Sequence, residues 1–293
     1  MDMLGEIFNV VAPIFVCCSI GFFWVKNGFG YDASFITRLV TNIGFPCLIF
    51  SVMSKSEMTE EIFEEMSIAA LVSVLIFFAL GATFLKTLKL SQLTYLPSLA
   101  LANTGNMGLP LCLFSFGSTG LAYGFAYFWV QILMVFCLGS TMAAKSLNFK
   151  IILRLPLIWA IAVAFVFNYF DFKLPSGFDN TVKLLGDFAI PLCLITLGAS
   201  LADLKINSIK HSVIFSFFRL SSGFLIGVFL SELLGFDGVA RGVLIIMCSM
   251  PSAVFNYLFA ELYHNQPQEI AGIVLISTIF SFATLPLLLW FVM

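Results

Sequence analysis

Two long apolar segments are each interrupted near the middle by proline and by amide or hydroxyl side chains. The first covers residues 94–114 and the second residues 239–261. Each is long enough to cross a bilayer, which takes about 20 residues of α-helix. Hydrocarbon offers no hydrogen-bond partner to a freed backbone group, so such breaks are tolerated only where protein or a water-filled cavity surrounds them. We therefore expect two broken membrane helices whose loose centres lie side by side.

The composition indicates an integral membrane protein that crosses the bilayer many times. Of the 293 residues, 60% are hydrophobic and only 10% are charged, whereas a soluble domain has about 25% charged residues. No basic stripe suggests nucleic acid, and the expected surroundings are the lipid bilayer. Asp2 and Glu6 precede the first apolar stretch without a basic segment. This stretch is therefore predicted to be a membrane helix rather than a signal peptide.

We predict an all-α membrane fold with ten transmembrane helices joined by short connections that leave no room for a soluble domain. The predicted spans are approximately 5–25, 32–53, 63–86, 94–114, 119–144, 149–170, 178–202, 208–234, 239–261 and 267–292.

The basic residues of the loops predict the orientation of these spans. One alternating set of loops contains eight: Lys26, Lys86, Lys89, Lys145, Lys150, Arg154, Lys205 and Lys210. The other set contains four: Lys55, Lys173, Lys183 and Arg241. Because the richer side is expected to be cytoplasmic, both termini are predicted to be extracytoplasmic.

The two halves of the chain resemble each other. A base, a polar residue and a proline recur at a constant offset of 145, as Arg38, Asn42 and Pro46 and again as Lys183, Asp187 and Pro191. The broken spans follow at an offset of 141, judged by Pro110 and Pro251. Five helices is an odd number, so residues 149–293 are predicted to repeat residues 1–145 upside down. Inverted repeats are typical of transporters that hold their substrate near the midplane.

The first break is predicted to bind the substrate. Its candidate residues are Asn103, Thr104, Gly105, Asn106, Met107, Gly108 and Pro110. Glycine lets a ligand approach the backbone, the N-terminus of a half-helix favours an anion, and asparagine supplies donors and acceptors. This combination suits a carboxylate. The alternative is a proline kink whose amides only satisfy freed backbone groups.

The second break is predicted to complete the site with Ser249, Pro251, Ser252 and Asn256. Other polar residues within the spans are interpreted as helix-packing residues: Gln131, Thr196, Ser277, Thr278 and Ser281. The seven cysteines are predicted to be buried free thiols, and their spacing indicates no metal site.

Five further residues are candidates for coupling to an ion, because ionisable groups inside membranes are costly and are often functional. They are Arg38, Asn42, Lys183, Asp187 and Arg219. Asp187 would take a proton or help to hold a cation, or else pair with Lys183 one turn away. Arg219 would find a carbonyl partner or act on the substrate. No cofactor is predicted, and the choice between H⁺ and Na⁺ stays open.

Other functions are less well supported by the sequence. It contains no Gly-x-Ser-x-Gly, His-Glu-x-x-His or Walker motif, so it is not expected to be an enzyme. An anion channel or a non-transporting membrane sensor is the alternative to a transporter. A sensor, however, usually needs a soluble output domain, and none fits in these loops.

Three stretches resemble the auxin efflux carrier family, which is best known from the plant PIN proteins. They are residues 103–111 with 116–120, residues 185–201, and residues 250–263 with 275–287. The resemblance covers essentially the whole chain and implies a fold similar to that of bile-acid symporters and sodium/proton antiporters. Helices one, two, six and seven would form a scaffold, and helices three to five and eight to ten a transport domain. It also implies an elevator-like movement, a homodimer, Asn103 and Pro110 on the first crossover, and Pro251 on the second.

The chain departs from the plant proteins in two places. About four residues join the fifth and sixth spans, where the plant proteins have a long hydrophilic loop, and Leu155-Pro156 stands where the family often has Asn-Pro. The compact form resembles bacterial members associated with small organic acids such as malate or malonate. The expected function is therefore secondary transport of mono- or dicarboxylates or auxin-like acids across the bacterial inner membrane.

Overall fold

The computed structural model describes residues 3–54, 60–144, 156–170, 172, 174–204 and 208–293. Several residues used above lie outside these ranges, including residues 149–155 of the sixth predicted span. The others are Asp2, Lys55, Lys145, Lys150, Arg154, Lys173 and Lys205. Within the described ranges the secondary structure is helical, apart from one isolated antiparallel bridge between Ala102 and Ser252.

The described helices divide between the two halves of the chain. The first half contains α1 (Met3–Lys26), α2 (Ala33–Leu39), the π-helix η1 (Val40–Gly44), α3 (Phe45–Met53), α4 (Glu60–Thr87), α5 (Gln92–Ala100), the π-helix η2 (Thr104–Gly108) and α6 (Leu109–Ala144). The second half contains α8 (Pro156–Tyr169), α9 (Ser176–Asp187), α10 (Ala189–Asp203), α11 (Ile209–Leu233), α12 (Gly238–Cys248), α13 (Val254–Leu262) and α14 (Pro267–Val292).

Seven helical segments within the described residues are long and apolar enough to cross a membrane. They are Gly5–Lys26, Ala33–Met53, Ile62–Thr87, Thr104–Val135, Ser176–Asp203, Ile209–Leu233 and Pro267–Val292. Pro156–Tyr169 and Gly238–Cys248 are apolar but shorter. The protein is therefore all-helical and crosses the membrane several times.

The boundary predicted between residues 94–114 and residues 119–144 coincides with a sharp kink in the chain. The helical stretch that begins at Thr104 continues to Ala144, and Gly117 interrupts it with a φ of 64° and a ψ of −152°. A side chain at this φ would be strained, whereas glycine adopts it readily. The chain thus changes direction at one residue between two helical segments, and this residue lies within the predicted boundary at residues 115–118.

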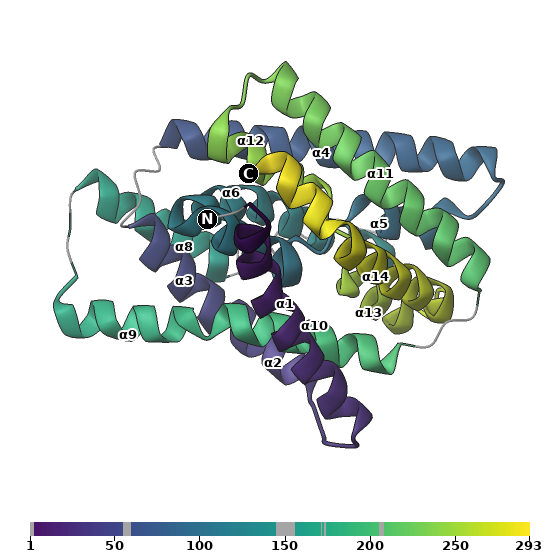
Figure 1. Cartoon of the computed structure of the whole chain (residues 1–293), viewed down its shortest axis with the longest axis horizontal. Helices are drawn as coiled ribbons and strands as arrows, with labels where there is room; N and C mark the ends of the chain where they lie inside the picture. The colour runs from purple at the N-terminus through teal and green to yellow at the C-terminus, as the bar shows by residue number, and fades with distance from the viewer. Residues whose placement is uncertain (1–2, 55–59, 145–155, 171, 173, 205–207) are drawn as a thin grey trace.

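The helices pack in two groups. One group combines α1, α2, α3, α8, α9 and α10, and the other combines α4, α5, α6, α11, α12, α13 and α14. Within them, α1 crosses α10, and α14 lies along α11 (Figure 1). The two groups meet where η2 packs against α10 and where α1 and α3 contact α6.

Helices α1 and α10 touch backbone to backbone through two glycines. A Cβ atom added to Gly21 would overlap the Ile195 carbonyl, and one added to Gly198 would overlap the Cys18 carbonyl. Small residues at helix crossings in membranes allow such close approach, and the close packing stabilises the pair.

We expect Gly198→Ala to lower the free energy of unfolding by about 3 kcal/mol, because the new methyl group meets a backbone carbonyl that cannot rotate away. Thermal unfolding of the purified protein in detergent would measure the effect. The matched control is Gly177→Ala, since a Cβ at Gly177 has no neighbour within 4 Å. Equal unfolding midpoints for the two variants would contradict the proposed tight crossing.

Candidate functional site

The two broken segments satisfy each other's backbone. The first break is residues 101–103, between α5 and η2, and the second break is residues 249–253, between α12 and α13. The Asn103 N–H donates to the Pro251 carbonyl at 2.8 Å, and the Ala253 N–H donates to the Leu101 carbonyl at 3.1 Å. The prediction that the loose centres lie side by side is confirmed by these two bonds.

Side chains reinforce this pairing. Asn256 Nδ2 donates to the Leu101 carbonyl at 3.0 Å and to Ser252 Oγ at 3.1 Å. The Ser252 N–H donates to Ser277 Oγ at 3.2 Å. Gln131 Nε2 donates to the Ala102 carbonyl at 3.4 Å. The predicted site residue Asn256 therefore acts as a clamp between the two breaks.

Pro110 and Pro251, on which the two breaks were aligned, lie in different local structures. The antiparallel bridge joins Ala102 of the first break to Ser252 of the second. Pro110 lies inside the first turn of α6, whereas Pro251 lies within the second break. The two prolines therefore occupy different places in their segments.

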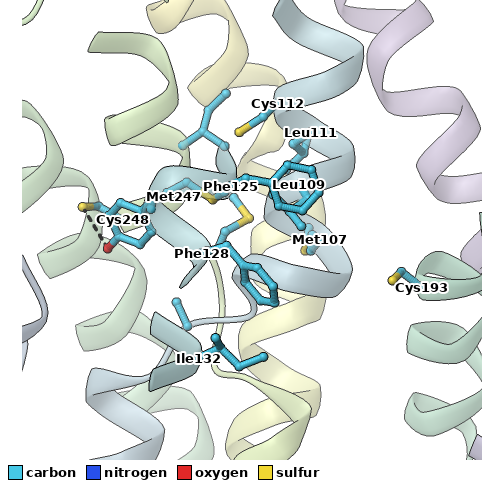
Figure 2. Packing of buried hydrophobic residues seen from close by; sticks show 14 of the residues in the cluster. Met107, Leu109, Leu111, Cys112, Phe125, Phe128, Ile132, Cys193, Met247 and Cys248 are labelled. Carbon is cyan, nitrogen blue, oxygen red and sulfur yellow. Dashed lines mark hydrogen bonds between the residues drawn. The ribbon is translucent and has the colours of Figure 1, made fainter. Parts of the chain in front are cut away.

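A small cavity of about 40 Å³, here called the central cavity, lies beside the first break. Its lining residues are Thr37, Val40, Thr41, Phe45, Ala102, Asn103, Thr104, Gly105, Asn106, Phe128, Gln131, Ile132, Val135, Cys193, Thr196, Ala253 and Phe255. In Figure 2, Phe128 and Ile132 lie on one side and Cys193 lies apart from them on the neighbouring helix. The cavity thus lies between the two packing groups of helices.

The polar groups of the central cavity are neutral. None of its lining residues is Lys, Arg, His, Asp or Glu. Asn103 is only 4% exposed, and its Nδ2 group has no hydrogen-bond partner among the described residues. A buried donor without a partner costs about 1–3 kcal/mol. This amide is therefore poised to donate to a ligand.

Two helix N-termini meet at the same cavity. Thr104, Gly105 and Asn106 begin η2, and Phe255 is the second residue of α13. The first N–H groups of a helix lack intrahelical partners, and the helix dipole adds positive charge there. Gly105 lies so close to Phe128 that an added Cβ would be 2.9 Å from the ring. The first break therefore presents N–H groups in a confined space that suits an anionic oxygen.

Four predicted site residues of the first break line this cavity, and three do not. The lining ones are Asn103, Thr104, Gly105 and Asn106. Met107 is buried, and its sulfur accepts a bond from Ser281 Oγ at 3.7 Å. Gly108 packs against Met247, since an added Cβ would be 2.6 Å from its sulfur. Met107 and Gly108, like Pro110, therefore contribute to packing within α6 and its neighbours; Figure 2 shows this packing around Met107 and Met247.

The residues of the second break contact different parts of the structure. Ala253 and Phe255 line the central cavity, but the predicted residues Ser249, Pro251, Ser252 and Asn256 do not. Pro251 and Ser252 are held in the pairing with the first break. Ser249 lines a larger apolar groove of about 540 Å³ between α11 and α14.

Arg219 lies inside the protein, with the carbonyl partner that the sequence analysis anticipated. It is fully buried on α11, and its Nη2 donates to the Cys248 carbonyl at 3.1 Å. Its guanidinium carbon lies 4.1 Å from the centroid of the Phe77 ring. Arg219 does not line the central cavity.

The remaining coupling candidates lie on the surface. Arg38 and Asn42 are exposed on α2 and η1, and Lys183 and Asp187 are exposed on α9. No ion pair joins Lys183 to Asp187 within the described structure. Asp187 is the last residue of α9, and α10 begins at Ala189 after a break at Phe188.

Several cavity residues were missed by the sequence analysis or were interpreted as packing residues. Thr37, Thr41 and Phe128 were not singled out, whereas Gln131 and Thr196 were assigned to helix packing. Thr196 Oγ1 bonds the Tyr31 hydroxyl at 2.7 Å. Burial raises the pKa of Tyr31, so the phenol stays protonated at neutral pH. The one available signal was the spacing of Thr37 and Thr41, which places both hydroxyls on one helix face.

The described residues offer no obvious metal or redox centre. Six cysteines have described side chains, and all six are free; Cys137 lies outside that set. No group of three or more His, Cys, Asp or Glu among the described residues could hold a metal ion.

Comparison with known sequences gives this arrangement its context. A family model described as membrane transport protein matches residues 6–152 and 143–289. The chain belongs to this family. The match confirms the resemblance to the auxin efflux carriers, and it makes the protein a membrane transporter rather than an enzyme.

Two relatives of this membrane transport protein are also transporters by name. An uncharacterised transporter of Methanocaldococcus jannaschii is 27% identical, and the alignment covers 96% of this chain and 97% of the relative. An uncharacterised transporter of Methanothermobacter thermautotrophicus is 28% identical over 87% of this chain and 88% of its own length.

For this membrane transport protein, we expect Asn256→Ala to loosen the pairing of the two breaks. Removing the amide leaves the buried Leu101 carbonyl and Ser252 hydroxyl short of a donor, which costs about 1–3 kcal/mol. Hydrogen exchange read by mass spectrometry should accelerate in peptides that contain residues 101–103 and 251–253. The control is Asn168→Ala, which removes a comparable 2.8 Å bond to the Met53 carbonyl. Unchanged exchange at both breaks in Asn256→Ala would refute the clamp.

Proposed function

We propose that this protein is a secondary transporter of small organic anions, moved by elevator-type alternating access. The observation that carries the proposal is the buried, unpartnered Asn103 Nδ2 group beside two helix N-termini in the central cavity. Each of these groups is a hydrogen-bond donor, and together they favour a ligand that only accepts.

A carboxylate is the simplest ligand of this kind. It accepts several hydrogen bonds, and helix N-termini stabilise its charge. Asn103 and Asn106 would donate through their amides, and the N–H groups of Thr104 and Gly105 through the backbone. Since no lysine or arginine lines the central cavity, the carboxylate would be held without a strong ion pair. Such a site releases its ligand readily, as a transporter requires.

The walls of the central cavity support a substrate with an apolar part. Phe45, Phe128, Ile132, Val135 and Phe255 surround the polar donors. Mono- and dicarboxylates and auxin-like acids combine a carboxylate with such a part. A cavity of about 40 Å³ has room for about three water molecules. Substrate entry therefore requires the walls of the cavity to move apart.

The location of the cavity between the two packing groups supports an elevator movement. Thr37, Thr41 and Thr196 come from the group of α1–α3 and α8–α10, and Asn103 and Gln131 come from the other group. We propose that the first group, helices one, two, six and seven of ten, is the scaffold. The second, helices three to five and eight to ten, would be the transport domain that carries the substrate.

Two contacts support an inverted repeat of residues 1–145 and 149–293. Gly44 and Ala189 are related by the same offset as Arg38 and Lys183, and a Cβ added to Gly44 would be 3.0 Å from that of Ala189. Ala102 of the first break and Ser252 of the second form the antiparallel bridge. Residues related by a two-fold axis that lies between two repeats meet their counterparts in this way.

We further propose that the protein lies in the plasma membrane, the inner membrane in a bacterium, with both termini extracytoplasmic. The distribution of loop lysines and arginines supports this orientation. A homodimer through the scaffold is supported by the exposed apolar side chains of α9, including Phe178 and Leu184.

We expect Asn103→Ala to abolish acid-dependent charge movement, because it removes a cavity amide donor that is buried without a hydrogen-bond partner in the described structure. Purified protein in liposomes on a solid-supported membrane would be exposed to acetate, malate, malonate and indole-3-acetate. A saturable current in the unchanged protein, lost in Asn103→Ala and kept in Asn180→Ala on the exposed face of α9, is the expected result. Currents too large for carrier turnover would instead indicate a channel.

If no current is observed, electroneutral exchange would be tested by counterflow with the radiolabelled acids. Absence of counterflow for every acid would overturn the proposed substrate class. Binding of an acid without current or counterflow would favour a non-transporting sensor.

We expect Asp187→Asn to abolish the dependence of transport on a pH gradient while leaving substrate binding intact. Asp187 is the only carboxylate of the apolar segment Ser176–Asp203 that adjoins a break between two helices within that segment, and a carboxylate at membrane depth is a natural proton site. The control is Asp203→Asn at the far end of α10. Uptake driven by imposed pH and Na⁺ gradients would be compared, and unchanged pH dependence in Asp187→Asn would eliminate this residue as the proton site.

A further inference from the structure

Arg219 is a buried charge that the pairing of the two breaks does not require. It lies on α11, is 0% exposed, and uses only Nη2 to bond the Cys248 carbonyl. Its Nε and Nη1 groups have no hydrogen-bond partner among the described residues. The Phe77 ring covers one face of the guanidinium at 4.1 Å. This is an expensive arrangement at membrane depth, so a structural explanation alone must be tested.

No negative charge compensates this guanidinium within the described part of the chain. No ion pair to Arg219 is found there. The polar groups around it are those of Tyr127, Cys248 and Ser73, in which the Tyr127 hydroxyl bonds Ser73 Oγ at 2.8 Å and Cys248 Sγ at 3.6 Å. A phenol and a thiol are both protonated at neutral pH. The surroundings of Arg219 are therefore neutral, and its full positive charge remains.

Arg219 lies at the negative end of a helix. Cys248 is the last residue of α12, and the final carbonyls of a helix carry about half a negative charge. Two such C-termini, of α5 and α12, and two positive N-termini, of η2 and α13, meet at the paired breaks. Without a further charge, the partial positive charges of the two N-termini and the partial negative charges of the two C-termini would nearly cancel. Arg219 neutralises the partial negative charge at the C-terminus of α12 and leaves a net positive charge at the paired breaks.

The other C-terminus shows that capping does not need a charge. The Leu101 carbonyl at the end of α5 receives the Ala253 N–H and the Asn256 amide, both neutral donors. A glutamine or asparagine on α11 would likewise satisfy a single carbonyl. The charge of Arg219 therefore exceeds what hydrogen bonding at Cys248 requires.

We propose that Arg219 is the specificity-determining charge of the transport site, making the neutral central cavity select anions. The inference rests on the proposed function, and it adds a consequence for energetics. Because Arg219 on α11 is held by Cys248 of α12 and by Phe77 of α4, the charge moves with these helices. Arg219 then adds one positive charge to the interior of the empty transport domain, and a bound monoanion cancels it. Membrane potential acts on the empty domain and not on the domain loaded with a monoanion.

The test compares Arg219→Lys, which keeps the charge, with Arg219→Gln, which keeps a donor but removes the charge. Both variants would be reconstituted beside the unchanged protein, after size-exclusion chromatography and thermal unfolding have shown that they are folded. Transport of malonate and indole-3-acetate would be measured at imposed potassium-diffusion potentials, with the neutral malonamide as a competing ligand.

We expect Arg219→Gln to raise the KM for the anions at least tenfold, to leave competition by malonamide unchanged, and to alter the dependence of transport on potential. Arg219→Lys should raise the KM less than Arg219→Gln does, because it keeps the charge, although an ammonium group does not stack on Phe77 as the guanidinium does. A folded Arg219→Gln with unchanged KM and voltage dependence would overturn the inference. Equal losses in both variants, accompanied by lower unfolding midpoints, would reduce Arg219 to a structural cap.

A second measurement needs no variant. The unchanged protein without substrate should show a transient charge movement after a voltage step, and saturating indole-3-acetate, a monoanion, should suppress it. Active transport without this transient would overturn the inference while leaving the proposed function standing. Absence of transport and binding for every acid in the unchanged protein would overturn both.

Discussion

Backbone groups freed within a membrane must find partners in the protein, and the rest of this structure depends on how that requirement is met. The two breaks meet it by pairing Asn103 with Pro251 and Ala253 with Leu101. Hydrocarbon would leave each of these groups unsatisfied. Once the breaks are paired, the half-helices diverge from a common point, which brings two N-termini and two C-termini together. The central cavity and the position of Arg219 both follow from this convergence.

The chain builds a polar site in an apolar protein without placing a charge in the cavity itself. Its donors are amides and backbone N–H groups, which remain neutral throughout any cycle of binding and release. The positive charge of Arg219 lies on α11, outside the lining of the central cavity, where Phe77 and Cys248 contact it. In the proposed site, the donors that would touch a ligand are separate from the charge that would set the local potential, and this separation would allow selectivity without tight binding.

Much of this organisation could be predicted from the sequence, because hydrocarbon restricts a membrane chain to few backbone conformations. Long apolar runs predicted helices such as α1, α4, α11 and α14, and proline with asparagine marked both breaks. The two prolines do not mark the same point, because Pro110 lies within the helical stretch that begins at Thr104 and Pro251 lies within a break. The cavity lining was only partly anticipated. Thr37, Gln131 and Thr196 come from three different helices, and sequence spacing cannot reveal which faces of separate helices converge.

The bridge between Ala102 and Ser252 also bears on how the chain is made. During synthesis the first break enters the membrane long before its partner in the second half of the chain exists. Until then the carbonyl of Leu101 and the N–H of Asn103 have neither water nor protein beside them in a lipid environment. The segment around the first break can therefore acquire its final form only after the segment around the second break has been inserted. Before that point, the first half of the chain must remain at the insertion machinery, at the membrane surface or in the form of an unbroken helix. The first break forms its final hydrogen bonds only once Ala253 and its neighbours have been inserted.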